Sequence, residues 1–138
     1  MTTNTRREFL KQAALSAAAL AAYPPPSVLG ANDRVRVGMI GAGGRGEELL
    51  KEVLEVPNAQ LVAIADVYSR RRDAAKELAP GIQTLEDHRR LLDMKDLDGV
   101  IVASPLHIHA RHFMDVIAAG KDLYCEKTMT WSIPEAEE

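Results

Sequence analysis

The sequence predicts an α/β protein with a doubly wound parallel sheet, and three observations support this fold class. Short apolar segments typical of buried strands alternate with longer segments whose apolar residues repeat with helical spacing. A glycine-rich turn joins the first strand to the first helix. Aromatic residues make up only 4% of the chain and alanines are many, which favours helices packed closely on a sheet. Strands and helices in alternation form right-handed βαβ units and hence a parallel sheet.

The expected elements follow one another in a regular order. Strands are predicted at residues 34–40, 60–65, 99–103 and 121–125, with a short extended piece at 82–83. Helices are predicted at 44–56, 69–79 and 107–119, with a shorter helix that ends at Leu92 and has its N-cap within residues 84–87. The run at 99–103 is continuously apolar, which indicates a strand buried on both faces. No internal repeat is visible.

The glycine-rich turn has the spacing of a dinucleotide-binding fingerprint. Gly41, Gly43 and Gly46 fit G-x-G-x-x-G, and Asp66 ends the next strand about 20 residues later. We expect Gly41 to allow the tight turn and Gly43 to let a pyrophosphate approach the backbone. Gly46 lets the helix pack close to the sheet. Strand, turn, helix, strand and acid together predict a Rossmann fold that binds a dinucleotide.

The same residues favour NAD as the cofactor. The helix N-terminus at Gly44 and Arg45 offers N–H groups and the positive end of the helix dipole to phosphates. Asp66 can accept hydrogen bonds from the adenosine ribose and repels a 2′-phosphate, so we expect NAD. The three arginines at 70–72 would screen a 2′-phosphate, which keeps NADP as the alternative; a solvated helix face is the other interpretation of these arginines.

The first 30 residues resemble a twin-arginine export signal. Arg6 and Arg7 lie in T-R-R-E-F-L-K, and an uncharged, alanine-rich stretch at 13–22 follows, too short to span a bilayer. Prolines at 24–26 break any helix, and small residues near Ala31 suit cleavage. We therefore expect export by the twin-arginine machinery to the periplasm or another extracytoplasmic compartment, with a mature domain at 31–138. An N-terminal helix of the fold is the alternative.

Composition argues against several other classes of function. The formal net charge of −3 gives no sequence-wide basic field, so we expect no nucleic-acid partner. The single cysteine, Cys125, cannot form an internal disulfide and is expected to be a small buried residue. His107 and His109 have metal-ligand spacing, but no Cys, Asp or Glu stands nearby to complete a site. We therefore expect no metal.

The last residues indicate a helix that has only begun. Ser132 is a candidate N-cap, and Glu135 is placed to reach back to it. The sequence stops three residues after Glu135. We therefore expect a fragment of a longer protein, with a sheet that is incomplete at its C-terminus.

Four segments, RVGMIGAGGRG, AIADVYSRR, GVIVASPLHIHA and AAGKDLYCEKTMT, resemble the N-terminal half of the Gfo/Idh/MocA oxidoreductases over residues 33–138. The resemblance implies hydride transfer between nicotinamide and a sugar or polyol hydroxyl, with substrate bound by a further domain. It also implies a homo-oligomer when full-length, and a fragment that is inactive alone. Exported relatives that cleave glycosides through transient sugar oxidation give the alternative, and a non-catalytic dinucleotide-binding module gives a third.

The resemblance also assigns a catalytic residue. The family motif E-K-P aligns with Glu126, Lys127 and Thr128, which implies that Lys127 lies by the nicotinamide and the substrate hydroxyl, with Glu126 beside the cofactor. The carboxyl end of a parallel strand faces the ligand crevice, in agreement with this role. Thr128 replaces a proline whose ring fixes the backbone, and this departure puts full activity in question. A solvated loop lysine is the other interpretation of Lys127.

The segment after the 99–103 strand completes the implied site. In the family these residues line the cofactor crevice, which assigns Ser104, Pro105 and His107 to cofactor binding. His107 resembles a contact on the nicotinamide side. Helix capping is the other interpretation of His107.

Overall fold

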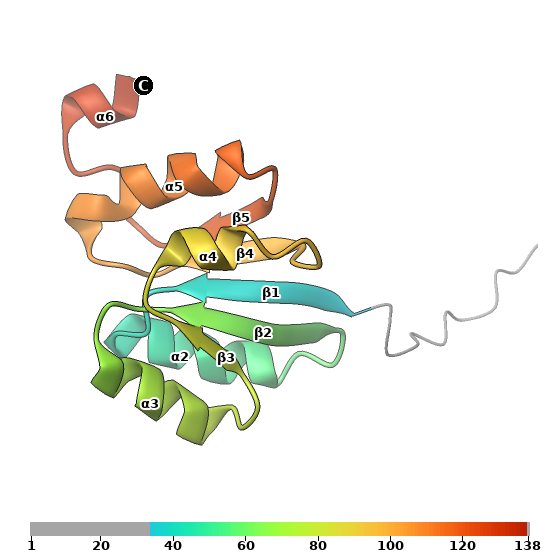
Figure 1. The fold of residues 1–138 in the computed structure, drawn as a ribbon. Helices are drawn as coiled ribbons and strands as arrows, with labels where there is room; N and C mark the ends of the chain where they lie inside the picture. The colour runs from blue at the N-terminus through green and yellow to red at the C-terminus, as the bar shows by residue number, and fades with distance from the viewer. Residues whose placement is uncertain (1–33, 138) are drawn as a thin grey trace, which may run out of the picture. The chain divides into compact units, whose positions relative to one another are not determined.

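The computed structural model describes residues 34–137, which form one parallel sheet with helices on both faces (Figure 1). The strand order is β3-β2-β1-β4-β5, and every neighbouring pair is parallel. The strands are β1 (Val35–Ile40), β2 (Ala59–Ala65), β3 (Gln83–Leu85), β4 (Gly99–Val102) and β5 (Asp122–Cys125). This order confirms the predicted doubly wound sheet. The predicted export signal at residues 1–30 lies outside the described residues.

The helices divide between the two faces of the sheet. Figure 1 shows α2 and α3 on one side, and α4 and α5 on the other. The helices are α2 (Gly44–Leu54), α3 (Ser69–Leu78), α4 (His88–Leu92), α5 (His109–Ala118) and α6 (Ile133–Glu137), with a 3₁₀ turn η1 (Leu106–Ile108) before α5. Among the residues in this range, no helix is long and apolar enough to cross a membrane.

Two apolar cores hold these layers together. Successive side chains of β1 point to opposite faces, so Met39 joins the core under α2 and α3 while Ile40 joins the core under α4 and α5. Leu50 of α2 and Val116 of α5 are almost completely buried against the two faces. Because full burial of such a side chain contributes roughly 1.5–3 kcal/mol, both helical layers are fixed on the sheet.

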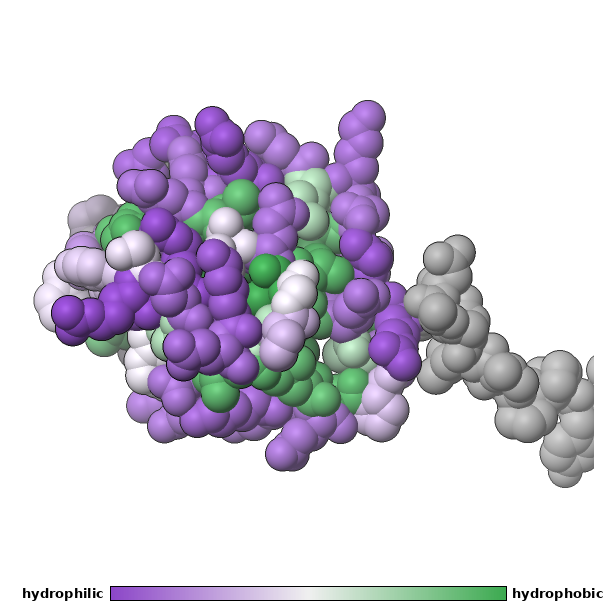
Figure 2. Space-filling view, turned by 60° about the horizontal axis from the view of Figure 1, so that its bottom comes forward, coloured by the Kyte–Doolittle hydropathy of each residue, from purple (hydrophilic) through white to green (hydrophobic). Residues whose placement is uncertain are grey.

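Helix α3 is the most weakly packed of the longer helices. Only Ala75 of its ten residues is buried. With the α3 side of the sheet turned toward the viewer, the surface is mostly hydrophilic, and apolar side chains show only in patches between polar ones (Figure 2). The polar residues of α3 therefore face water, except where the start of the helix meets the end of β2.

Several local predictions need correction. The N-cap of α4, predicted within residues 84–87, is Asp87, whose carboxylate accepts from the Arg89 N–H at 3.0 Å; Thr84 lies in β3 and takes no part in it. The helix predicted from residue 107 begins with η1 and becomes α-helical at His109. Cys125 is only partly buried, and desolvation raises the pKa of its thiol.

The expected start of the last helix is confirmed. The Glu135 carboxylate accepts from the Ser132 N–H at 3.0 Å and from the Trp131 N–H at 2.7 Å. Two donors that precede α6 are thereby satisfied.

Candidate functional site

Two neighbouring pockets open at the carboxyl ends of the strands. In a doubly wound sheet this is where ligands bind, since loops from adjacent strands diverge on either side of the central strand. The first, here called the β2-side pocket, has a volume of about 260 Å³ and is lined by the ends of β1, β2 and β4 and the loop after β3. The second, the β5-side pocket, has a volume of about 330 Å³ and lies between the start of α2 and the ends of β4 and β5. Ser104 lines both pockets, so the two form adjoining parts of one crevice.

The glycine turn between β1 and α2 is fixed by steric demands. Gly41 has a φ of +95°, and a Cβ there would meet the Ala103 carbonyl at 2.7 Å. A Cβ on Gly46 would meet the Gly41 carbonyl oxygen at 2.2 Å. Both positions therefore exclude any larger residue, and the turn brings α2 directly against the end of β1.

The N-terminus of α2 fits a pyrophosphate. Gly43 is the N-cap and has extended backbone angles, and no side chain caps the helix. A Cβ built on Gly44 would have no other atom within 4 Å, so the first turn of α2 borders open space. The N–H groups of an uncapped helix end together with the helix dipole make a binding place for an anion. The start of α2 therefore fits the pyrophosphate of the dinucleotide that the glycine fingerprint predicts.

Asp66 lies in the β2-side pocket and also holds the glycine turn. Only 4% of its side chain is exposed. Its Oδ2 accepts from the Ala42 N–H at 2.8 Å, and its Oδ1 accepts from the Tyr68 N–H at 2.9 Å. A carboxylate has about four acceptor positions, so two remain for a ligand hydroxyl. The sequence predicted a ribose contact; the structure adds that Asp66 ties β2 to the turn.

Of the three arginines that follow β2, only Arg71 lines the pocket. Its guanidinium lies 5.0 Å from the centre of the Tyr68 ring, and its Nη1 is 3.7 Å from the Asp66 Oδ2. Arg72 instead donates to the Asp66 carbonyl at 2.7 Å, and Arg70 is exposed. The pocket therefore has a carboxylate and a guanidinium side by side at the end of β2.

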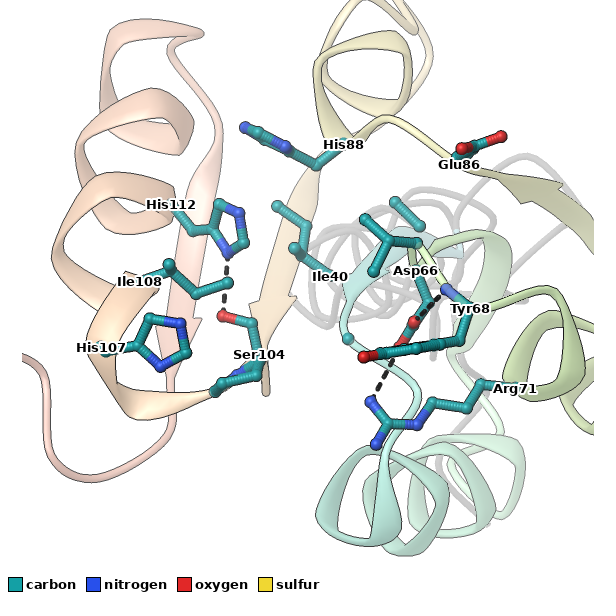
Figure 3. A pocket seen from close by; sticks show the side chains of 14 residues that line it. Ile40, Asp66, Tyr68, Arg71, Glu86, His88, Ser104, His107, Ile108 and His112 are labelled. Atoms are coloured by element: carbon teal, nitrogen blue, oxygen red, sulfur yellow. Dashed lines mark hydrogen bonds and ion pairs between the residues drawn. The ribbon is translucent and has the colours of Figure 1, made fainter.

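The opposite wall of the β2-side pocket comes from the segment after β4. Figure 3 shows two walls on either side of Ile40: Asp66, Tyr68 and Arg71 on one, and Ser104, His107, Ile108 and His112 on the other. Pro105 also lines this pocket. His107 therefore lies in the pocket of Asp66 and is not among the residues that line the pocket of Lys127.

Two histidines of this pocket were not predicted from the sequence. His112 Nδ1 lies 2.8 Å from the Ser104 Oγ, and the His112 ring centre lies 4.4 Å from that of His88 (Figure 3). Burial, together with the neighbouring His88, lowers the pKa of His112 to about 4. His88 in turn contacts Asp115 at 2.7 Å. No local motif marks these residues, because they come from α4 and α5 and meet only when both helices pack on one face.

The β5-side pocket is charged, and an ion pair forms part of its lining. Arg45, in the first turn of α2, donates from Nε to the Glu126 Oε1 at 2.9 Å, and its Nη2 lies 2.8 Å from the same oxygen. The Arg45 hydrogen bond lowers the pKa of Glu126, whose side chain is only 11% exposed, and the carboxylates of Glu48 and Glu126 raise the pKa of Arg45. Lys127 follows at the end of β5; it is exposed and lines the same pocket. The predicted residues Arg45, Glu126 and Lys127 are thus brought together.

His109 also lines the β5-side pocket, although the sequence marked it only as half of a metal-like pair. It is 1% exposed, with Nδ1 at 2.8 Å from the Thr128 carbonyl and Nε2 at 2.6 Å from the Ser104 carbonyl. Within residues 34–137, no group of three or more His, Cys, Asp or Glu side chains is placed to hold a metal ion. The ring of His109 therefore links two loops of the protein.

Comparison with known proteins gives a consistent result. A family model described as an oxidoreductase family with an NAD-binding Rossmann fold matches residues 35–138. A glycosyl hydrolase family 109 protein of Stenotrophomonas maltophilia is 36% identical over 133 residues, which cover 88% of this chain and 29% of that protein. An inositol 2-dehydrogenase of Arthrobacter sp. is 31% identical over 113 residues, covering 77% of this chain and 34% of the relative.

A solved structure agrees with these sequence relatives. The scyllo-inositol dehydrogenase of Lactobacillus casei, with bound NAD(H) and scyllo-inositol, matches with a TM-score of 0.70 and 25% identity. The match covers 75% of this chain and 31% of that one. The chain thus spans about a third of the length of these relatives.

Proposed function

Because this chain belongs to the Gfo/Idh/MocA oxidoreductases and carries their NAD-binding Rossmann domain, we propose that its protein is an NAD-dependent sugar or polyol dehydrogenase. One observation carries the proposal furthest. The two pockets adjoin at Ser104, with the glycine turn and Asp66 at one and Lys127 at the other. A dinucleotide that spans both pockets would then have its adenosine ribose near Asp66 and its nicotinamide near Lys127, the proposed proton-transfer group.

Each end of the crevice has a separate task in this proposal. The uncapped start of α2 binds the pyrophosphate, and Asp66 accepts from the adenosine ribose. NAD, when bound, supplies the hydride acceptor. Lys127 hydrogen-bonds the substrate hydroxyl through its Nζ and helps to remove the hydroxyl proton as the hydride leaves. The Arg45–Glu126 pair borders the place where substrate and nicotinamide meet and helps to keep it ordered.

We expect NAD to be preferred over NADP. A 2′-phosphate bound beside Asp66 would be repelled by its nearly buried carboxylate, because like charges repel. Arg71, next to Asp66, would offset part of this repulsion. Titration calorimetry of residues 31–138 with each cofactor tests both points. Equal affinity for NAD and NADP would contradict the preference, and the absence of any dinucleotide binding would contradict the proposed site.

Substrate turnover requires more than these residues provide. Catalysis needs the sugar positioned against the nicotinamide, and residues 34–137 supply the walls of a cofactor crevice. We therefore expect this chain alone to bind NAD and to reduce none of it when sugars or inositols are added. Sugar-dependent NADH formation by the purified chain would contradict this expectation.

A second candidate is an NAD-dependent glycoside hydrolase that oxidises the sugar transiently and re-reduces it. The 36% identity to a glycosyl hydrolase family 109 protein over 88% of this chain favours it. The full-length protein separates the two candidates. A dehydrogenase accumulates NADH with free sugar or inositol, whereas the hydrolase releases an aglycone from a glycoside without net NADH.

We also propose that the protein is exported by the twin-arginine machinery to the periplasm or another extracytoplasmic compartment. The proposal is supported by Arg6 and Arg7 in T-R-R-E-F-L-K and by the weakly apolar stretch after them. Residues 1–30 fused to a reporter that folds before export should direct it out of the cytoplasm. Changing both arginines to lysine should stop this export, and continued export would contradict the proposal.

A further inference from the structure

We propose that His109 is a positioning residue that holds the segment carrying Lys127 against the end of β4. The inference rests on the proposed function, in which Lys127 acts on the substrate hydroxyl. His109 itself is assigned no contact with substrate or cofactor. Its task is to fix where the backbone of residues 127 and 128 lies.

The geometry of His109 supports this task. The residue begins α5 and its side chain is buried, with Nε2 at 2.6 Å from the Ser104 carbonyl and Nδ1 at 2.8 Å from the Thr128 carbonyl. Ser104 follows β4, and Thr128 lies in the loop after β5. One ring therefore joins the two loops that form the walls of the β5-side pocket.

The chemistry of the two partners defines the bridge. A carbonyl oxygen only accepts hydrogen bonds, so each contact requires an N–H from the ring. The bridge is complete only when His109 carries a proton on both nitrogens. A buried ring with two such partners has little freedom to rotate, which is what a positioning residue needs.

A second contact holds Glu126, the residue before Lys127. Glu126 is held by Arg45 at 2.8 Å, from the first turn of α2. Lys127 thus stands between two residues that are tied to the starts of two different helices, while its own side chain is exposed. The backbone is fixed on both sides and the amine is left to meet a substrate.

Nuclear magnetic resonance of the folded chain tests the bridge without any assay of activity. When the histidine rings are labelled with nitrogen-15 and the buffer is mildly acidic, His109 should show two slowly exchanging ring N–H signals. The His109→Phe variant identifies these signals by their loss. A single ring N–H for His109 would overturn the bridge.

Backbone nitrogen-15 relaxation tests whether the bridge holds the loop. His109→Phe keeps a ring of similar size but donates no hydrogen bond, and the backbone order parameters of residues 127–130 should fall in this variant from about 0.85 to below about 0.6. Val116→Ala is the matched control, because Val116 is equally buried in α5 and belongs to the core under α4 and α5. It should lower overall stability without selective change at 127–130. Equal effects of both variants on this loop would overturn the proposal.

Kinetics of the full-length protein supply the last test. Since small misplacement of a reacting group is costly, His109→Phe should lower kcat by about 10²-fold while the KM for NAD changes little. His109→Gln keeps one amide donor and should recover part of the loss. An unchanged kcat in His109→Phe would overturn the positioning role. If the dehydrogenase proposal is wrong, the unaltered enzyme will show no dehydrogenase activity. The two resonance tests will still report on the His109 bridge in that case.

Discussion

The Asp66 wall of the β2-side pocket is held together by residues close in the sequence, whereas the ion pair of the β5-side pocket joins residues far apart. Asp66 bonds to amides 24 and 2 positions away, at Ala42 and Tyr68. Arg45 and Glu126 are separated by 81 positions. The Asp66 wall of the first pocket is thus built within one β-α-β unit, whereas the second pocket forms only when β5 has joined the sheet. This difference suggests that cofactor affinity depends on the first pocket and turnover on the second.

The largest expected effect tests whether turnover depends on the β5-side pocket. Lys127→Met in the full-length protein should lower kcat by about 10²-fold or more, the lower bound for a general acid–base group, and leave NAD affinity nearly unchanged. The pyrophosphate is proposed to bind the backbone N–H groups at the start of α2 and not the Lys127 side chain, which is why affinity should persist. Steady-state kinetics and calorimetry measure the two quantities. Near-full activity would remove Lys127 from the mechanism and point to Thr128 as the departure that matters.

A steric change tests the first pocket. Gly46→Ala places a Cβ 2.2 Å from the Gly41 carbonyl, and such overpacking should lower the free energy of unfolding by about 1–3 kcal/mol and weaken NAD binding. Gly44→Ala is the matched control, since its Cβ would meet no atom within 4 Å. Urea unfolding should show little change for this control. If both variants are equally stable, the turn is less constrained than its geometry indicates.

Removing a charged side chain from the β2-side pocket should have a smaller effect, on cofactor affinity and preference. Asp66→Ala removes two hydrogen bonds and the proposed ribose acceptor, so NAD affinity should fall about tenfold and the preference over NADP should narrow. Arg71→Ala should act in the opposite direction, weakening NADP more than NAD. Asp66→Asn, which keeps one acceptor oxygen, separates the loss of charge from the loss of the turn contact. Unchanged cofactor preference in Asp66→Ala would show that another residue discriminates.

The last expected effect concerns the pH dependence of stability and does not involve the cofactor. Because the pKa of His112 is lowered from 6.5 to about 4 in the folded protein, the unfolded chain takes up a proton first as the pH falls. The free energy of unfolding should therefore decline from about pH 6.5 toward pH 4, and His112→Phe should remove this decline. Asp87, with a pKa lowered from 3.8 to about 2 by Arg89, acts below that window. Denaturant unfolding at several pH values measures the slope, and an identical slope in the variant would exclude His112 as its source.

Local sequence determined the parallel sheet and the Asp66 wall of the first pocket. A Cβ at Gly41 or Gly46 collides with neighbouring backbone, so the glycine spacing specifies the turn directly. The run in β4 is buried throughout from Val100 to Val102, as a continuous apolar run predicts. Asp66 was identified because its position at the end of β2 is a fixed distance from the turn. These features depend on sterics and periodicity, which operate over a few residues.

Only the tertiary structure decided which polar groups meet. The sequence named Arg45 and Glu126 as site residues, but their ion pair forms because α2 and the end of β5 reach the same edge of the sheet. It offered His107 and His109 together, and folding placed the first in the β2-side pocket and the second as a buried bridge to Thr128. The physical reason is that a buried polar group takes whatever partner the packed elements bring to it. That partner is set by strand order and register, which no local pattern of residues contains.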